Sequence, residues 1–212
     1  DDFHFAKTAL LCLENTQGGK VLPQEYLKKA KKFTKDNSLS LHLDGARIFN
    51  AAVKLNIDVK EITQYFDTIS CCLSKGLGAP VGSVLCGPQH LIKKARRWRK
   101  VLGGGMRQAG ILAGAGIYAL SNNIQRLEKD HGNALALARG LAEIEGINID
   151  VDLVQTNIFF ADIKADMVHL CDYLKKKGII IDKSNNLRIV THLDISEEDI
   201  DYTIKAVKGF FT

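Results

Sequence analysis

One lysine stands where an apolar strand is expected to open into a glycine-rich turn. Residues 68–73 are β-branched or apolar and carry no charge, whereas residues 76–83 contain three glycines and a proline, which excludes a helix. Lys75 lies at the mouth of this strand, and partial burial of an amine disfavours its ammonium form and makes it a better nucleophile toward carbonyl carbons. The segment predicts Schiff-base chemistry, with an ordinary solvated lysine at a strand end as the alternative.

A carboxylate occupies the matching position after the preceding strand. Residues 38–43 alternate leucine with polar residues and lead to Asp44, and Arg47 follows one helical turn later. Because ligands of parallel sheets collect at the carboxyl ends of the strands, Asp44 and Lys75 are expected to face one crevice. A carboxylate against a ring nitrogen and a lysine against an aldehyde are the two protein groups that pyridoxal phosphate requires. The alternatives are a helix cap for Asp44 and a local ion pair for Arg47.

Strands and helices alternate through the first half of the chain, which predicts a mostly parallel sheet with right-handed crossovers. The last strand follows a connection too short for a helical crossover, so it is expected to run antiparallel to its neighbour. The expected strands are 9–13, 38–43, 68–73 and 83–87, and the expected helices are 23–35, 48–55, 59–65 and 88–100.

The second half predicts a small α+β domain. A helix that begins near Met106 carries small residues every few positions, which favours deep packing or a subunit interface. A long amphipathic helix at 124–143 suits a bridge between domains, and we expect the domains to span 1–122 and 123–212. The expected strands are 157–163, 179–181 and 187–190, and the further helices are 166–177 and 196–211.

Composition is that of a soluble globular protein, with 46% hydrophobic and 25% charged residues and a net charge of +5. No apolar run has the length of a membrane span and no signal peptide opens the sequence, so a cytoplasmic location is expected. The five cysteines show no metal-ligand spacing, and we interpret them as reduced core residues without a metal. A basic tract at 93–100 suits an anionic cofactor, an interface or a solvated helix face, with nucleic acid as a further alternative.

Five blocks occur in order along the chain: LENT at 13–16, HLDGAR at 42–47, LSKGLGAPVGS at 73–83, WRK with GGGMRQ at 98–108, and RIVTHLD at 188–194. Together they closely resemble the low-specificity L-threonine aldolases. The resemblance implies pyridoxal-phosphate fold type I, the α/β fold of aspartate aminotransferase, with the C-terminal part of the large, mostly parallel-sheet domain followed by the small α+β domain. It further implies pyridoxal 5'-phosphate as cofactor and retro-aldol cleavage of L-threonine or L-allo-threonine to glycine and acetaldehyde.

The resemblance also implies roles for single residues. Lys75 would hold the cofactor as a Schiff base, Asp44 would pair with its pyridine nitrogen, and Arg47 would lie beside its phenolate oxygen. Arg188 would bind the substrate carboxylate through two N–H donors of its planar guanidinium group. The residues implied at the phosphate end or the subunit boundary are Ser74, Lys100 and Arg107.

Some features depart from the family or leave a choice open. The family carries a further N-terminal part with a phosphate-binding loop and a ring-stacking histidine, so this sequence is expected to hold the Schiff-base half of the site. Gln17 stands where the family usually has histidine. His192 is expected to be packed and hydrogen-bonded, with the carboxylate pocket as the alternative. The family implies a homotetramer that acts on small amino acids without nucleic acid or membrane partners. A β-eliminating lyase or aminotransferase of the same fold and a non-catalytic truncated relative remain alternatives.

Overall fold

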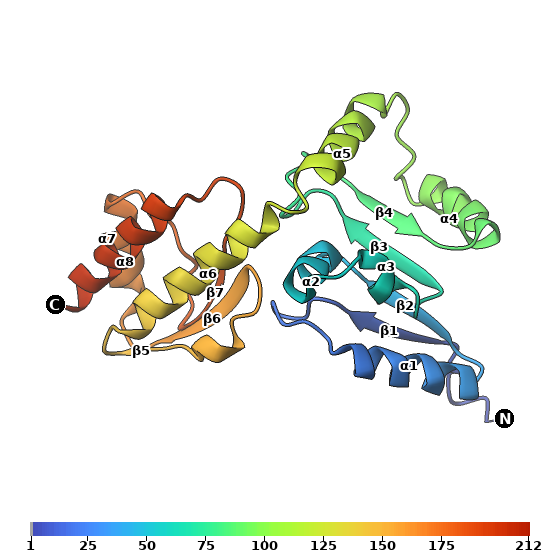
Figure 1. Ribbon diagram of the computed structural model, residues 1–212, viewed down its shortest axis with the longest axis horizontal. Helices are drawn as coiled ribbons and strands as arrows, with labels where there is room; N and C mark the ends of the chain where they lie inside the picture. Colours follow the sequence, from blue (N-terminus) through green and yellow to red (C-terminus); the bar gives the residue numbers. More distant parts are fainter. Residues whose placement is uncertain (1) are drawn as a thin grey trace.

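The computed structural model describes residues 2–212 and places them in two lobes that helix α6 (Leu127–Ala142) joins (Figure 1). The first lobe is built on a four-stranded sheet and the second on a three-stranded sheet. The first lobe contains β1 (Leu10–Glu14), β2 (Ser40–Asp44), β3 (Thr68–Cys72) and β4 (Ser83–Cys86), with α1 (Gln24–Asp36), α2 (Ile48–Leu55), α3 (Val59–Thr63), α4 (Gln89–Val101) and α5 (Gly110–Asn122).

The four strands of the first sheet lie in sequence order, β1-β2-β3-β4. β1, β2 and β3 run parallel, and β4 runs antiparallel to β3, with Cys72 opposite Ser83. This confirms the prediction of a mostly parallel sheet with an antiparallel last strand. Because β2 and β3 are parallel neighbours, the residues that follow them emerge at the same edge of the sheet.

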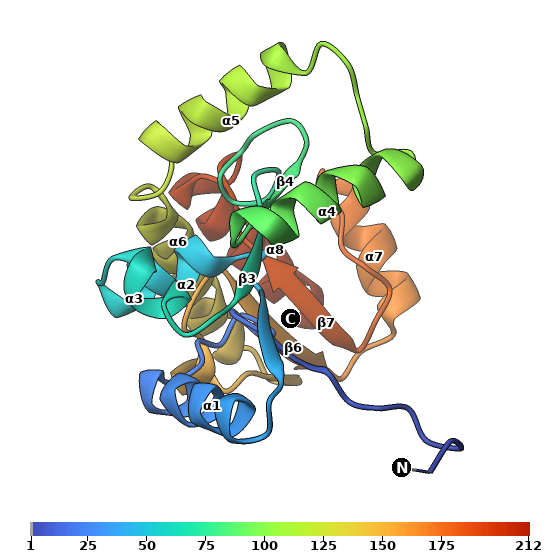
Figure 2. The ribbon, with the colours of Figure 1, turned by 90° about the vertical axis from the view of Figure 1, so that its right-hand side faces the viewer.

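The core of the first lobe lies between the sheet and the helices α1, α2 and α3, which cover one side of the sheet (Figure 2). The alternation along β2 sends Leu41 and Leu43 into this core, where both are fully buried, and leaves Ser40 and Asp44 exposed. Burial of each leucine contributes roughly 2 kcal/mol. The packing therefore fixes the register of β2 and with it the position of Asp44 at the strand end.

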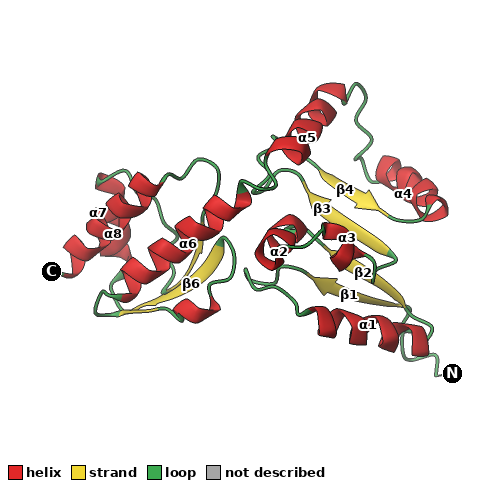
Figure 3. Cartoon of the chain, in the orientation of Figure 1, coloured by secondary structure: helices red, strands yellow, loops and turns green. Residues whose placement is uncertain are grey.

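The second lobe packs helices against one small antiparallel sheet (Figure 3). Ser196 begins the last helix with a capping box, since its hydroxyl accepts from the Asp199 amide at 3.1 Å while the Asp199 carboxylate accepts from the Ser196 amide at 2.9 Å. This confirms the predicted helix start. The elements of this lobe are β5 (Ile147–Asn148), a 3₁₀ turn (Val151–Leu153), β6 (Ile158–Ile163), α7 (Met167–Lys176), β7 (Asn186–Val190) and α8 (Glu197–Phe211).

The strand predicted at 179–181 is absent from the structure. The backbone amide of Ile179 instead donates to the carbonyl of Leu174 at 3.0 Å and closes the end of α7, with Gly178 in the left-handed conformation at φ 78°. This hydrogen bond to α7 leaves the Ile179 amide unable to pair with a strand. The third strand of the sheet is instead β5, which pairs with β6. A boundary between domains at residue 122 stays a prediction.

One further prediction fails in part within this chain. Cys12 and Cys86 are exposed rather than part of a core, because β1 is an edge strand and β4 is exposed along its length. The helix rich in small residues, α5, extends away from the sheet and exposes Ile111 and Tyr118 (Figures 1 and 2). Of the two alternatives predicted for this helix, deep packing does not hold within this chain, and a subunit interface stays a prediction. Every helix within residues 2–212 is too short or too polar to span a membrane.

Candidate active site

A pocket of about 500 Å³ opens where the loop after β3 meets the loop after β7. Both lobes supply its walls, and three of the predicted site residues lie among them. A larger hollow of about 810 Å³, which residues of α2, α3 and the start of α6 line, contains none of the predicted residues. The polar and charged residues that line the smaller pocket are Arg47, Ser74, Lys75, Asn157, His192 and Asp194.

Lys75 stands on a turn that two backbone hydrogen bonds close. The amide of Gly78 donates to the carbonyl of Lys75 at 2.8 Å, and the amide of Ala79 donates to the carbonyl of Leu73 at 3.0 Å. Gly78 has φ 75°, a left-handed conformation that favours glycine. The turn is thus fixed, but the lysine side chain is exposed. The prediction of partial burial is wrong for this chain, because the pocket is open on the side of Lys75.

Asp44 occupies the predicted position at the carboxyl end of β2, where it pairs in register with Ser70 of β3. Its Oδ1 accepts a hydrogen bond from the backbone amide of Ala46 at 3.0 Å, which stabilises the turn that leads into α2. No other side-chain hydrogen bond of Asp44 occurs within residues 2–212. The carboxylate is exposed and lies at the same sheet edge as Lys75, outside the residues that line the pocket.

Arg47 is half-buried and faces a second arginine. Its Nε is buried without a hydrogen-bond partner among the described residues. Burial lowers the pKa of Arg47, and the positive charge of Arg188 lowers it further, while Cys72 and Glu14 oppose the shift. Within residues 2–212 Arg47 forms no salt bridge, so the alternative of a local ion pair does not hold. A poorly solvated guanidinium beside a second cation is suited to bind an anion.

Arg188 comes from the second lobe, where it lies on β7 opposite Phe160 of β6. Its side chain is exposed, and Val190 of the same strand lines the pocket. His192 follows and is exposed at the pocket wall, with its Nδ1 3.3 Å from the Asp194 amide. His192 is hydrogen-bonded as predicted, but it is not packed. The structure therefore brings His192 into the pocket lining, whereas Arg188 lies outside the lining residues but close enough to Arg47 for its charge to act on it.

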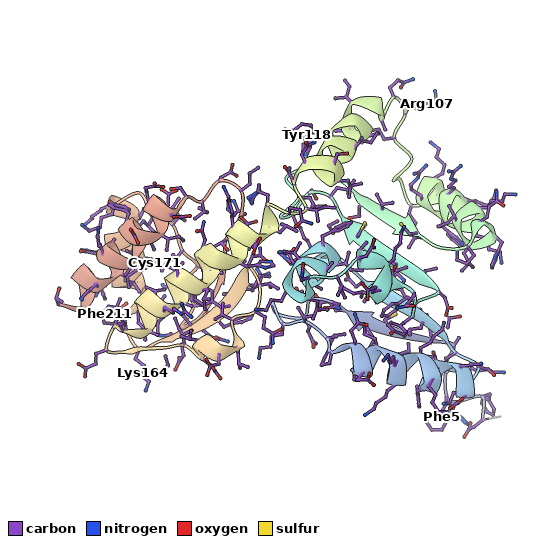
Figure 4. All side chains as sticks on the ribbon, viewed as in Figure 1. Phe5, Arg107, Tyr118, Lys164, Cys171 and Phe211 are labelled. Carbon is purple, nitrogen blue, oxygen red and sulfur yellow. The ribbon has the colours of Figure 1, made fainter. Side chains whose placement is uncertain are left out.

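Lys100 and Arg107 are not brought to this pocket. Lys100 lies in the last turn of α4 and Arg107 in the loop that precedes α5, and both are exposed. Figure 4 shows Arg107 at the outer end of the segment that carries α4 and α5, away from the second lobe. Ser74, the third residue of the predicted phosphate-end group, does line the pocket. No cluster of metal-ligating side chains occurs in the part of the chain from residue 2 to residue 212.

Sequence reasoning missed two asparagines. Asn157 lines the pocket and is buried, and Asn50 of α2 donates a hydrogen bond to it across the two lobes. The available signal was an amide at the start of the apolar segment 157–163, which was expected as a strand and nothing more. No periodicity encodes a contact between residues so far apart in sequence.

Comparison with known proteins identifies the family to which the chain is similar. The sequence model of the beta-eliminating lyases matches residues 1–165. Low specificity L-threonine aldolase of Escherichia coli (strain K12) is 54% identical over 201 residues, which cover 94% of this chain and 60% of that protein. The chain thus spans about 60% of the length of this curated relative.

Solved structures share the fold at low identity. A putative aromatic amino acid beta-eliminating lyase/threonine aldolase from Exiguobacterium superposes with a TM-score of 0.83 at 20% identity, covering 95% of this chain and 62% of that one. A PLP-dependent aminotransferase from Streptococcus suis superposes with a TM-score of 0.70 at 17% identity, covering 97% and 58%. These likenesses confirm the predicted fold, pyridoxal-phosphate fold type I.

Proposed function

The chain belongs to the beta-eliminating lyase family, and from this premise we propose that it serves the pyridoxal-phosphate-dependent cleavage of L-threonine and L-allo-threonine to glycine and acetaldehyde. One observation carries the proposal: Lys75 and Arg47 line a single pocket, and Arg188 lies close enough to lower the pKa of Arg47. The 54% identical relative, itself a low specificity L-threonine aldolase, supports the choice of substrate.

The residues of the pocket fit pyridoxal 5'-phosphate. Arg47 offers a buried Nε without a partner, and the exposed amine of Lys75 stands on a rigid turn. Lys75 would hold the cofactor's aldehyde carbon, Asp44 its ring nitrogen, and Arg47 its phenolate side, with Ser74 toward the phosphate. When bound, the cofactor supplies an electron sink for the carbanion that forms at the substrate Cα.

The chain's own side chains orient the substrate and control protons. Arg188 binds the substrate carboxylate through two parallel N–H donors, which fixes the amino acid against rotation. The Asp44 carboxylate keeps a proton on the ring nitrogen by favouring the charged form of that nitrogen. The Lys75 amine would hold the cofactor between turnovers, and its exposed position would leave it accessible to the amine of an incoming substrate.

We also propose that the enzyme is a cytoplasmic homotetramer of amino acid catabolism, with a large domain through residue 122 and a small domain from residue 123. The exposed apolar side chains of α5 support association, because monomers rarely leave such a surface uncovered. Lys100 and Arg107 would then serve a phosphate at the subunit boundary. The basic tract that contains Lys100 needs no nucleic acid to explain it.

Product analysis tests the proposed reaction. The cofactor-loaded enzyme, incubated with L-threonine, should release glycine and acetaldehyde in equal amounts. Release of 2-oxobutyrate and ammonia would contradict the proposal and favour a β-eliminating lyase, and transfer of the amino group to an added keto acid would favour an aminotransferase. Absence of both products and of any cofactor absorbance would favour a non-catalytic relative.

A further inference from the structure

Two buried amides join the lobes behind the pocket. Asn50 of α2 is 3% exposed and Asn157, which precedes β6, is 1% exposed. The Nδ2 group of Asn50 donates to Oδ1 of Asn157 at 3.2 Å, and the Nδ2 group of Asn157 donates to the backbone carbonyl of Thr191 at 2.9 Å. We name this pair, Asn50 with Asn157, the amide bridge. It connects a helix of the first lobe to two segments of the second.

On the side of the second lobe, the amide bridge fixes the end of β7. The backbone amide of Thr191 donates to the Asn157 carbonyl at 3.0 Å, and the Thr191 hydroxyl donates to the Asp130 carbonyl of α6 at 2.6 Å. Thr191 is thereby held at three polar atoms. The next residue, His192, lines the pocket, and Arg188 lies three residues before Thr191 on the same strand.

On the side of the first lobe, the amide bridge lies directly behind the lysine turn. A Cβ on Gly76 would lie 3.9 Å from Oδ1 of Asn50 and 2.7 Å from Cδ2 of Leu127. The backbone amide of Asn50 donates to the carbonyl of Arg47 at 3.0 Å. Asn50 therefore lies next to the segment that carries Lys75, and it belongs to the same helical turn as Arg47.

Buried amides are tolerated where each donor and acceptor is paired, and removing one partner leaves the other without compensation. The donor of Asn50 and the acceptor of Asn157 meet only at one relative placement of the lobes. A hydrophobic contact at this point would permit sliding, whereas directional hydrogen bonds fix both distance and orientation.

We propose that Asn157, acting through Asn50, is a positioning residue that sets the spacing between Lys75 and Arg188 and thereby aligns the substrate carboxylate for cleavage. This inference rests on the proposed function, because it assigns Arg188 to the carboxylate. Asn157 acts through the placement of β7 and takes no part in proton transfer. Its loss should weaken substrate alignment while the cofactor remains bound to Lys75.

A double-mutant cycle in the cofactor-loaded enzyme tests the bridge. Asn50→Ala and Asn157→Ala should each raise KM for L-threonine about tenfold with kcat changed less than about threefold, and the double variant should be less impaired than the two single effects added together, since both remove the Asn50–Asn157 bond. Asn133→Ala is the matched control. Asn133 is buried on α6 and donates to the Ile195 carbonyl at 2.9 Å, but this bond stays within the second lobe.

Amide hydrogen exchange supplies a second readout that needs no activity. Asn157→Asp keeps the shape of the side chain and the acceptor for Asn50 but loses the donor to Thr191. It should accelerate exchange across residues 188–194 about tenfold, whereas Asn133→Ala should leave that segment unchanged. If the wild-type enzyme cleaves no threonine, the proposed function fails, while exchange across residues 188–194 still tests the bond from Asn157 to Thr191 in Asn157→Asp and the amide bridge in Asn50→Ala. An unchanged KM, additive effects of the two alanines, or unaltered exchange would overturn the inference.

Discussion

The positive charge of Arg188 acts on Arg47, a half-buried arginine of the pocket wall. Burial and then the charge of Arg188 disfavour the protonated form of Arg47 and lower its pKa, and no carboxylate within residues 2–212 forms a salt bridge with Arg47. Two cations held together by two separate lobes repel each other until an anion binds between them. The arrangement is therefore complementary to a ligand with more than one negative group, as a cofactor phenolate and a substrate carboxylate together provide.

His131 adds a proton-sensitive group to the amide bridge. Its Nε2 lies 3.1 Å from Nδ2 of Asn50. Because the amide nitrogen can only donate, Nε2 must accept, which requires a neutral imidazole with its proton on Nδ1. Burial, followed by the charge of Lys54, lowers the pKa of His131 to about 4. Protonation of His131 would therefore oppose the bond that joins the lobes.

Folding stability should consequently depend on pH through His131. Between its folded pKa of about 4 and its ordinary value of 6.5 the unfolded chain binds more protons. Stability is therefore complete above pH 6.5 and falls as the pH approaches 4, by roughly 2 kcal/mol after allowance for partial exposure. Urea unfolding at pH 7 and pH 4.5 measures this. His131→Gln, whose amide oxygen can still accept from Asn50, should remove this part of the pH dependence.

The control for this measurement is His90→Gln, at an exposed position on α4. It should leave the difference in unfolding free energy between pH 7 and pH 4.5 as it is in the wild type. If His131→Gln retains the full difference as well, the neutral imidazole is not the group that the acid titrates.

At the level of elements, alternating patterns in the sequence were enough to predict the sheet. The uncharged run at 68–73 and the alternating leucines at 38–43 identify β3 and β2, and chain order then places Asp44 and Lys75 at one edge. Arg47 follows from its spacing after Asp44. These predictions succeed because a parallel sheet with short crossovers converts sequence order directly into position.

The predictions that failed depend on contacts with no local signal. The apolar run at 179–181 reads as a strand, but a glycine before it turns its first amide back onto α7. The small residues of α5 allow close packing, but the sequence does not show which segment packs against them. The amide bridge joins positions 107 residues apart, and neither asparagine belongs to a recognisable motif.

The lysine turn should be intolerant of even one added methyl group. A Cβ at position 76 would meet the Cδ2 methyl of the fully buried Leu127 of α6 at 2.7 Å, so Gly76→Ala must displace the turn or the Leu127 side chain. We expect a loss of about 1–3 kcal/mol in unfolding free energy, typical of overpacking. We also expect weaker retention of the cofactor, measured by its absorbance after gel filtration.

Gly132→Ala is the matched control on α6, because a Cβ there meets nothing within 4 Å. It should raise the unfolding free energy by about 0.5–1 kcal/mol through helix propensity alone. A Gly76→Ala variant as stable as wild type, with full cofactor retention, would show that the turn is not packed as described.

For the whole molecule, the pocket depends on both lobes, since Lys75 comes from the first and Asn157 and His192 come from the second. The segment that carries α4 and α5 extends beyond both lobes and exposes Trp98, Ile111 and Ile117. A surface of this kind is typical of an interface. The same segment carries Lys100 and Arg107, which fits their proposed place at a subunit boundary.

Association should therefore depend on α5. Ile111 is 88% exposed, and Ile111→Glu should place a charge in the interface and reduce the mass measured by light scattering from that of a tetramer to a smaller species. Ile180, in a loop of the second lobe, is 85% exposed and serves as control. An Ile180→Glu variant should remain tetrameric, and a tetramer that persists in Ile111→Glu would place the interface elsewhere.

The central claim is that Lys75 forms the covalent bond to the cofactor. Borohydride reduction of the cofactor-loaded enzyme fixes that bond, and digestion followed by mass spectrometry locates it. We predict that the added mass of the reduced cofactor lies on Lys75 and that Lys75→Ala carries no such adduct. An adduct on another lysine, or one that persists in Lys75→Ala, would contradict the account.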